Sequence, residues 1–291
     1  MSQWELEFDY DEFNSPNDIY SSSSHHSFST ANSFTGDTSL HVPWREGQNH
    51  MGSSWCMLDN FNLQGLNQHG QSHQLRQFVS FYIDPNWTES AGGRFLASSF
   101  RVGSGDSGGG NTDGTNGHSV RHEMQNGSNG TWNMSSYAYN VEGPTYTTIS
   151  DALHHGWNHI ETYVQMNTWS GSSMNQDGIV RIWIDDQLEL EQTNHAWTYQ
   201  DDNLIERCFV NTWVVSSASP DQDYHHYYDR HAIDTTGDNP TQPYGAPDGE
   251  PFEPEPPDIP TDLEHIDETF DHHNLGGNYT GDTAAFDTGS N

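Results

Sequence analysis

Lysine is absent from this sequence: all 8 basic residues are arginine, and they face 42 aspartate and glutamate residues, a formal net charge of -34. A surface this acidic repels nucleic acid and anionic membranes, so a nucleic-acid partner is excluded on electrostatic grounds. The self-repulsion of such a chain is screened at high salt. Because the complete loss of lysine exceeds what acidity requires, we predict a protein of a halophile or of a virus of halophiles. The alternative is an acidic phage or marine protein.

Cysteine is scarce, and long apolar runs are missing. The two cysteines, Cys56 and Cys208, stand in the strand-like runs WCML and RCFV. They form either a disulfide or two buried thiols, and we favour the thiols. No apolar run reaches membrane-spanning length, which argues against membrane insertion. The first residues, MSQWELEFDYDEF, lack the basic and apolar regions of an ordinary signal peptide. We expect an extracellular or virion-surface protein, since virion components and lysis products need no such peptide.

Helical periodicity is also absent, and aromatic residues make up 12% of the chain. These features favour an all-β fold in residues 1–235. The composition changes after Thr235: residues 236–291 hold eight of the 13 prolines, 13 acidic residues and no arginine. Such a stretch buries too little apolar surface to fold alone. We therefore predict an extended acidic tail or linker, which could dock on a neighbouring subunit or virion component.

The clearest pattern lies between Gly156 and Leu190, where residues alternate with a period of two and predict a hairpin of two long strands. One face is aliphatic and is predicted to pack on a core. The other face mixes charged, amide and aromatic side chains, which are typical of a surface that binds sugars by stacking and hydrogen bonding. The predicted glycan-binding residues on that face are Glu161, Tyr163, Gln165, Arg181 and Trp183.

Further alternating runs predict strands at 75–84, 118–124, 131–141 and 224–234. In the second of these, Ser119 and Arg121 share a face, and in the third Tyr137 and Tyr139 share a face. The glycine-rich stretch 92–117 contains no Gly-Lys-Ser/Thr sequence, so a phosphate-binding loop is not indicated. We predict that this stretch is a flexible loop over a binding face.

These motifs together resemble the polysaccharide lyases of the alginate/glucuronan-lyase type. The resemblance covers residues from about 33 to 234 and rests on GGRFLASSF, HSVRHEM, SYAYN and GWNHIETYVQMN in that order. It implies a concanavalin A-like β-jelly-roll sandwich. The family's Ser-x-Arg matches Ser119 and Arg121, and its Tyr-x-Tyr matches Tyr137 and Tyr139. Its Gly-Gly-Lys is met by Gly-Gly-Arg, so Arg94 stands where the family has lysine.

The resemblance implies β-elimination on a uronic acid. Arg94 and Arg121 would bind the substrate carboxylate, and arginine suits this role because its guanidinium binds carboxylates in a two-pronged fashion. Tyr137 and Tyr139 would accept and donate the protons, and Ser119 would position a polar group. No metal or other cofactor is required. The implied partner is an acidic polysaccharide or surface glycan.

Three functions remain open at this stage. The first is a virion or cell-surface protein of a halophile that recognises glycans. It binds acidic polysaccharide and, if it is catalytically active, also cleaves it by β-elimination. The second is a secreted uronate polysaccharide lyase. The third is a purely structural virion turret, decoration or tail protein, assembled through the acidic tail. The fold alone does not choose among them.

Overall fold

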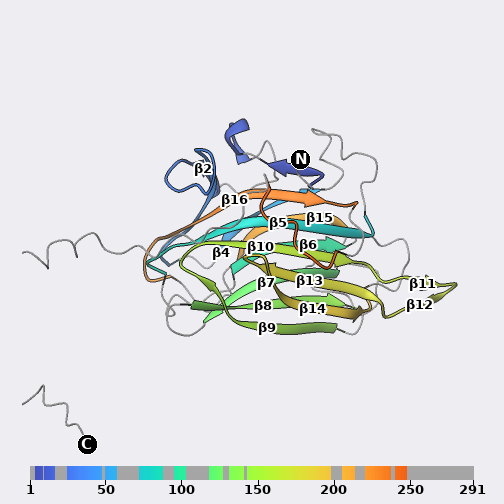
Figure 1. Ribbon diagram of the computed structural model, residues 1–291. Helices are drawn as coiled ribbons and strands as arrows, with labels where there is room; N and C mark the ends of the chain where they lie inside the picture. Colours follow the sequence, from blue (N-terminus) through green and yellow to red (C-terminus); the bar gives the residue numbers. More distant parts are fainter. Residues whose placement is uncertain are drawn as a thin grey trace, which may run out of the picture. The chain divides into compact units, whose positions relative to one another are not determined.

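The computed structural model is almost entirely antiparallel β-structure, as predicted (Figure 1). Its only helical element among the described residues is one 3-10 turn, η1 (Tyr10–Glu12). The structure describes residues 4–8, 10–16, 25–47, 50–57, 72–87, 95–102, 118–126, 131–140, 143–197, 205–213, 220–236 and 240–247.

The first sheet has eight strands, with β10 and β5 at its centre. In spatial order they are β14 (Gln187–His195), β13 (Gly178–Ile184), β10 (Gly156–Gln165), β5 (Gln74–Ile83), β16 (Tyr224–Asp234), β3 (Ser39–Trp44) and β2 (Ser27–Ser29), and β1 (Leu6–Phe8) pairs with β16. The two central strands run antiparallel in continuous register, with Ile160 opposite Val79. The predicted hairpin is confirmed as β10 and β13, which pair directly.

The second sheet has six strands and contains the Ser-x-Arg and Tyr-x-Tyr motifs. In spatial order they are β4 (His50–Met57), β15 (Ile205–Trp213), β6 (Phe95–Val102), β7 (His118–Asn126), β8 (Thr131–Asn140) and β9 (Gly143–His154). A small hairpin, β11 (Trp169–Ser170) and β12 (Ser173–Met174), forms the connection between β10 and β13.

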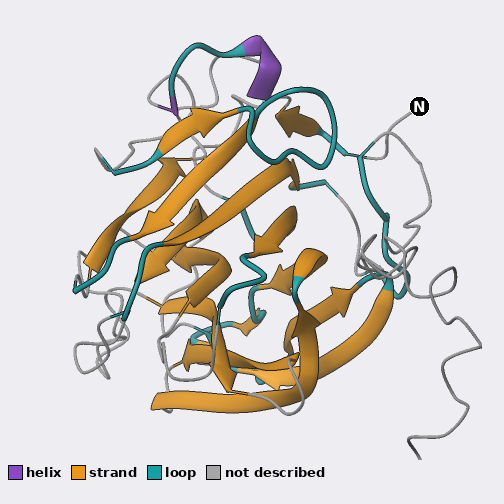
Figure 2. Ribbon diagram, turned by 90° about the vertical axis from the view of Figure 1, so that its left-hand side faces the viewer, coloured by secondary structure: helices purple, strands orange, loops and turns teal. Residues whose placement is uncertain are grey.

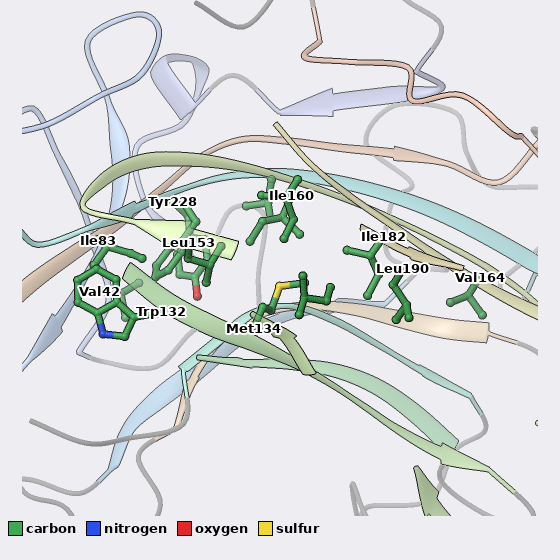
Figure 3. Packing of buried hydrophobic residues seen from close by; sticks show 14 of the residues in the cluster. Val42, Ile83, Trp132, Met134, Leu153, Ile160, Val164, Ile182, Leu190 and Tyr228 are labelled. Carbon is green, nitrogen blue, oxygen red and sulfur yellow. The ribbon is translucent and has the colours of Figure 1, made fainter. Parts of the chain in front are cut away.

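A single large apolar cluster joins the two sheets, whose strands are orange in Figure 2, and Figure 3 shows part of this cluster. Val79, Ile160 and Ile182 of the eight-stranded sheet and Trp132 and Met134 of the six-stranded sheet are all buried in it. Figure 3 shows Ile160, Ile182, Trp132 and Met134 between the ribbons of the two sheets. The alternation of residues along these strands therefore places apolar side chains in the core, as predicted, because every second residue points to the same face of its sheet.

Local turn chemistry closes the hairpin between β13 and β14. Asp185 and Asp186 both have positive φ, 48° and 63°, and they are the only two residues between the strands. Positive φ at both central positions is the type I′ arrangement, which matches the twist of paired strands, and aspartate tolerates it better than most residues. A two-residue turn at Asp185–Asp186 therefore joins β13 to β14.

The prediction of a loop over the whole of 92–117 was wrong in part. Residues Phe95–Val102 form strand β6, which pairs with β7 on one side and β15 on the other. The neighbouring glycines led to the prediction of a loop, although the run FLASSFRV contains bulky residues that favour a strand. The backbone groups of this run are satisfied by hydrogen bonds to a strand on each side. The stretch 103–117 lies outside the described residues.

Contacts between Cα atoms group Met1–Phe252 into one compact unit and Glu253–Asn291 into another. The sequence predicted a boundary at residue 235, and the described residues 240–247 belong to the first unit. The acidic tail beyond residue 247 lies outside the described residues and stays a prediction. Within the described parts of the chain, no helix is long and apolar enough to cross a membrane.

Candidate functional site

The face of the six-stranded sheet that points away from the core is the first candidate site. Its orientation follows from β8 and β9, where Met134 pairs with Ile149 and both are buried in the core. The next pair, Ser135 and Thr148, therefore belongs to the opposite face, and Thr148 is exposed. The register between β8 and β9 is continuous from Met134 to Asn140, so odd-numbered positions of β8 stay on this non-core face.

The backbone register brings the two predicted motifs together on that face. Arg121 of β7 lies directly opposite Tyr137 of β8. Ser119 and Tyr139 lie two residues farther along the same strands, on the same side. Directly paired positions of antiparallel strands have Cβ atoms about 5 Å apart. Residues that are 16 positions apart in the chain thus become neighbours in the sheet.

The fifth predicted catalytic residue, Arg94, lies outside the described residues, immediately before β6. Strand β6 is the neighbour of β7, with Ser99 opposite Arg121. The catalytic roles assigned to Arg94, Ser119, Arg121, Tyr137 and Tyr139 stay predictions, while the strands that hold the last four are confirmed.

Thr131, Asn133 and Asp151 form a hydrogen-bonded cluster near the beginning of β8, which no sequence motif indicated. Asn133 shares the non-core side with Tyr137, and its Oδ1 accepts a hydrogen bond from the Asp151 amide at 2.8 Å. The Thr131 hydroxyl donates to Asp151 Oδ1 at 2.6 Å. Asp151 has a φ of 52° at an irregularity in the pairing of β8 with β9. Only the tertiary pairing shows that this bulge carries a carboxylate at the border of the candidate face.

The second predicted surface, on the outer side of β10 and β13, is not an open surface. Glu161, Tyr163, Arg181 and Trp183 are buried, with relative exposures of 1–5%, and Gln165 is half-buried. The prediction of an exposed sugar-binding face here was wrong. Alternation correctly separated the two faces of each strand, but other parts of the same chain cover the outer one.

A short segment after β16, residues 240–246, is one of the parts that cover this face; we call it the covering segment. The Glu161 carboxylate accepts hydrogen bonds from the backbone amides of Tyr244 and Gly245 at 3.1–3.2 Å. Arg76 Nη2 donates to the Gln242 carbonyl at 2.5 Å, and Arg181 Nη1 donates to the Pro240 carbonyl at 3.1 Å. The charged groups of the sheet therefore satisfy the backbone of the covering segment.

Arg76 and Glu161 form the buried centre of this contact. They are an ion pair between neighbouring strands, with side-chain exposures of 1% and 3%. The Arg76 guanidinium lies 3.5 Å from the centre of the Tyr244 ring and 5.1 Å from that of Trp183, in cation–π contact with both. Burial raises the pKa of the Glu161 carboxyl to about 7, and the charge of Arg76 opposes that rise.

The N-terminal region completes the cover. Trp4 packs with Phe78 and Ala232 of the sheet, and its ring meets that of Tyr244 edge-on at 5.2 Å. Its Nε1 donates to the Gly245 carbonyl at 3.2 Å. The Tyr244 hydroxyl donates to Asp234 Oδ2 at 3.0 Å. Residues near both ends of the compact unit thus meet over the predicted sugar surface.

The two cysteines lie directly opposite each other, Cys56 on β4 and Cys208 on β15. Cys208 alternates with Arg207 and Phe209. This direct pairing fits either open alternative, a cross-strand disulfide or two adjacent thiols. Across the part of the chain that the structure describes, no group of three or more His, Cys, Asp or Glu side chains is arranged to hold a metal ion.

No family model and no curated protein sequence matches this chain. Solved structures do match it. An alginate lyase from Chlorella virus, vAL-1, superposes with a TM-score of 0.61 at 13% identity, over 80% of this chain and 100% of that one. The chain has the jelly-roll fold of polysaccharide lyases. The alginate lyase Aly36B gives a TM-score of 0.59 at 18% identity, over 78% of this chain and 95% of that one.

This chain is also similar in structure to the marine alginate lyase from Aplysia kurodai. The TM-score is 0.54 at 15% identity, over 72% of this chain and 87% of that one. Identities this low establish the shared fold. The resemblance stated from the sequence motifs and the likeness found in three dimensions agree on the lyase-type sandwich.

Proposed function

We propose that this protein recognises an acidic polysaccharide on the non-core face of its six-stranded sheet and cleaves it by β-elimination. The observation that carries the proposal is the register of β7 and β8, which sets Arg121 opposite Tyr137 with Ser119 and Tyr139 beside them. This is the pairing that the chemistry needs, because a cation and a proton-transfer group must reach the same sugar.

The proposed reaction divides the work among these residues. Arg121, with Arg94, neutralises the uronate carboxylate, so that the adjacent ring carbon can lose its proton to a tyrosine. The electron pair forms a carbon–carbon double bond and expels the glycosidic oxygen on the neighbouring carbon. The other tyrosine gives that oxygen a proton. Arginine at position 94 can supply charge, while lysine could also donate a proton at ordinary pH.

Two similar structures support the class of substrate. Both vAL-1 and Aly36B are named alginate lyases, and a variant of Aly36B was solved in complex with an alginate tetrasaccharide. That variant superposes on this chain with a TM-score of 0.54 at 21% identity. The acidic surface of the chain also repels a carboxylated polysaccharide, so binding would need a local group of cations and enough salt to screen the repulsion elsewhere.

The test is incubation of the full chain with alginate, polyglucuronate and a neutral glucan at high salt. We expect ultraviolet absorbance from the unsaturated product on at least one uronate polymer and none on the glucan. Tyr137→Phe and Tyr139→Phe variants should each lose the signal while their thermal unfolding stays unchanged. If the wild-type chain neither cleaves nor binds any uronate polymer, the proposal is overturned.

A second candidate is glycan binding without cleavage, and the arginine at position 94 specifically favours it. If proton transfer requires lysine at this position, the chain would retain carboxylate recognition and lose chemistry. Binding of uronate oligomers on a glycan array, with no unsaturated product at any pH, would select this function. Arg94→Lys should then gain cleavage.

The proposed location is the surface of a virion or cell of a halophile, with the acidic tail as the attachment to a neighbouring subunit. The net charge of -34 and the loss of all lysine support it. Particles purified from a producing culture should contain the full chain. A chain lacking residues 253–291 should still bind glycan and fail to join the particle. Recovery only as a free protein in the medium would favour the secreted lyase, and presence in particles without glycan binding would favour the structural role.

A further inference from the structure

Two histidines meet on the non-core face of the eight-stranded sheet, across the pair β3 and β16. On β3, Leu40 and Val42 are buried in the core, so His41 between them points to the opposite face. His41 lies directly opposite Tyr227 of β16, and His225 precedes Tyr227 by two residues on the same face. The His41 Nε2 atom is 2.9 Å from the His225 Nδ1 atom. The proposed glycan site is on the other sheet and uses neither histidine.

The two nitrogen atoms point at each other. The 5.1 Å between the ring centres is close to the 2.9 Å nitrogen distance plus one radius of each ring, and the ring planes differ by only 25°. A neutral imidazole has one protonated nitrogen and one nitrogen with a lone pair. A proton between the two rings therefore makes a hydrogen bond. In the tautomers without that proton, both lone pairs are directed at the same point, where a metal ion can bind.

The spacing is close to what a shared metal ion needs. Two imidazole nitrogens that bind one tetrahedral zinc ion at about 2.0–2.1 Å are about 3.3 Å apart. The observed nitrogen distance is shorter by only a few tenths of an ångström. The side chain of His225 is exposed, so a small rotation of its ring can make room for the ion. No movement of the backbone is needed.

The His41 ring is held in place and is neutral. It stacks on the Tyr227 ring with centres 5.0 Å apart, and Tyr227 in turn meets the Tyr82 ring at 5.8 Å. Burial lowers the pKa of His41 to about 4, and the nearby charges of His225 and Arg45 add to this effect. At pH 7 the ring therefore has no proton to lose before it binds a metal, which removes one cost of binding.

The charged neighbours are engaged with each other and leave the two imidazoles as the ligands. Arg45 pairs with Asp223 at 2.7 Å, and the Glu46 amide donates to the same carboxylate at 2.8 Å. This matches the finding that the described residues contain no group of three or more metal-binding side chains. The net charge of -34 attracts cations to the whole surface, and only a site with nitrogen ligands selects among them.

We propose that His41 and His225 together bind one transition-metal ion of the Zn²⁺, Ni²⁺ or Cu²⁺ type. The ion bridges β3 and β16, and water completes its coordination shell. Imidazole nitrogen suits these ions, whereas Mg²⁺ and Ca²⁺ take oxygen ligands. The bridge stabilises the fold, because an ion held by both strands binds the native protein more tightly than the unfolded chain. The site is independent of the proposed glycan activity.

The test is thermal unfolding of the full chain with and without Ni²⁺, after a chelator has removed bound metal. With free Ni²⁺ at about a hundred times its Kd, we expect the wild-type melting temperature to rise by about 5–10 °C. The variants His41→Gln and His225→Gln should each lose most of this rise. Mg²⁺ at the same ionic strength should shift the wild type and both variants equally, because it acts through screening alone.

His154→Gln is the matched control. It makes the same change at another partly exposed histidine, which lies 3.6 Å from the Asp185 carboxylate and not against a second imidazole. This variant should keep the full nickel-dependent rise. Calorimetric titration then counts the ions. His41→Gln and His225→Gln should each bind one Ni²⁺ fewer per chain than the wild type, and His154→Gln should bind the same number.

The chain has 18 histidines, so the differences between variants decide the outcome rather than nickel binding as such. An equal nickel-dependent rise in all four proteins would overturn the site, as would a loss in His154→Gln as large as in the other two. Should His41→Gln fail to fold, His225→Gln decides, because it changes an exposed side chain. Either negative result leaves the proposed glycan function standing, since that function depends on the other sheet.

Discussion

The outward faces of the two sheets differ in what their charged residues do. On the eight-stranded sheet, Arg76 and Glu161 are buried beneath the covering segment and Trp4, and they satisfy backbone groups of the same chain. On the six-stranded sheet, Arg121 shares a face with Ser119 and the two tyrosines. One face is closed by the chain itself, and the other holds the groups that we propose for a ligand.

This difference teaches that residue type alone does not mark a binding face. Both faces combine arginine and tyrosine on alternating strand positions, and both looked suitable for sugar in the sequence. The cover over β10 and β13 is what separates them, because a buried ion pair has exchanged water for fixed partners and has no remaining access to a glycan.

The largest expected effect comes from a substitution in the buried ion pair of the covered face. Arg76→Leu would leave the Glu161 carboxylate buried without its cation, and we expect a loss of about 3–5 kcal/mol in the free energy of unfolding. Urea denaturation measures it. Replacing both residues by leucine should recover much of the lost stability, since the double variant leaves no buried charge without a partner. A single variant as stable as the wild type would contradict the role given to this pair.

The next largest effect is expected from a substitution on the proposed ligand-binding face. Arg121→Gln should lower glycan binding or cleavage about 100-fold, because a charged hydrogen-bonding group opposite Tyr137 is lost. Its unfolding free energy should change by less than about 1 kcal/mol, in contrast to Arg76→Leu. Steady-state kinetics and urea denaturation of the same preparations compare the two sheets. Unchanged kinetics would remove Arg121 from the site.

A pH-dependent effect tests the buried histidine of β16. Burial lowers the pKa of His226 from 6.5 to about 3. Below pH 6.5 the unfolded chain therefore binds a proton that the native protein does not, and stability is lost as pH falls through that window. The lowered pKa of His226 alone should reduce the free energy of unfolding by about 2 kcal/mol at pH 5.

His226→Gln isolates this contribution. The raised pKa values of Glu161 and Asp229, about 7 and about 6, act in the opposite direction over overlapping windows, but both groups are retained in the variant and cancel in the difference. The variant should be less stable than the wild type at pH 7 and lose less stability on going to pH 5. Parallel pH profiles from denaturant unfolding would refute the assignment.

The smallest effect concerns the edge of the cover. Tyr244→Phe removes the hydroxyl that donates to Asp234 and keeps the ring over Arg76. The expected cost is about 1 kcal/mol. Tyr227→Phe, which removes a hydroxyl elsewhere on the same sheet, is the control for thermal unfolding. Equal melting temperatures for the two variants would argue against a stabilising bond at Asp234.

Much of the fold was predictable because alternation is a local property. The strands of the 156–190 hairpin, the run 224–234 and the core residues Ile160 and Ile182 follow from period-two patterns and turn residues. Strand β6 was missed because glycine-rich neighbours hid eight residues whose pairing lies on both sides, far along the chain.

The sequence by itself determined which residues share a face, since neighbouring side chains of a strand must point to opposite sides. Only the tertiary structure decided which of those faces is covered, because Tyr244 of the covering segment bonds to Glu161 from 83 positions away, and Trp4 bonds to Gly245 from 241 positions away. It also decided that Arg207, Arg101 and Ser119 stand in one row, since register between distant strands depends on the whole sheet.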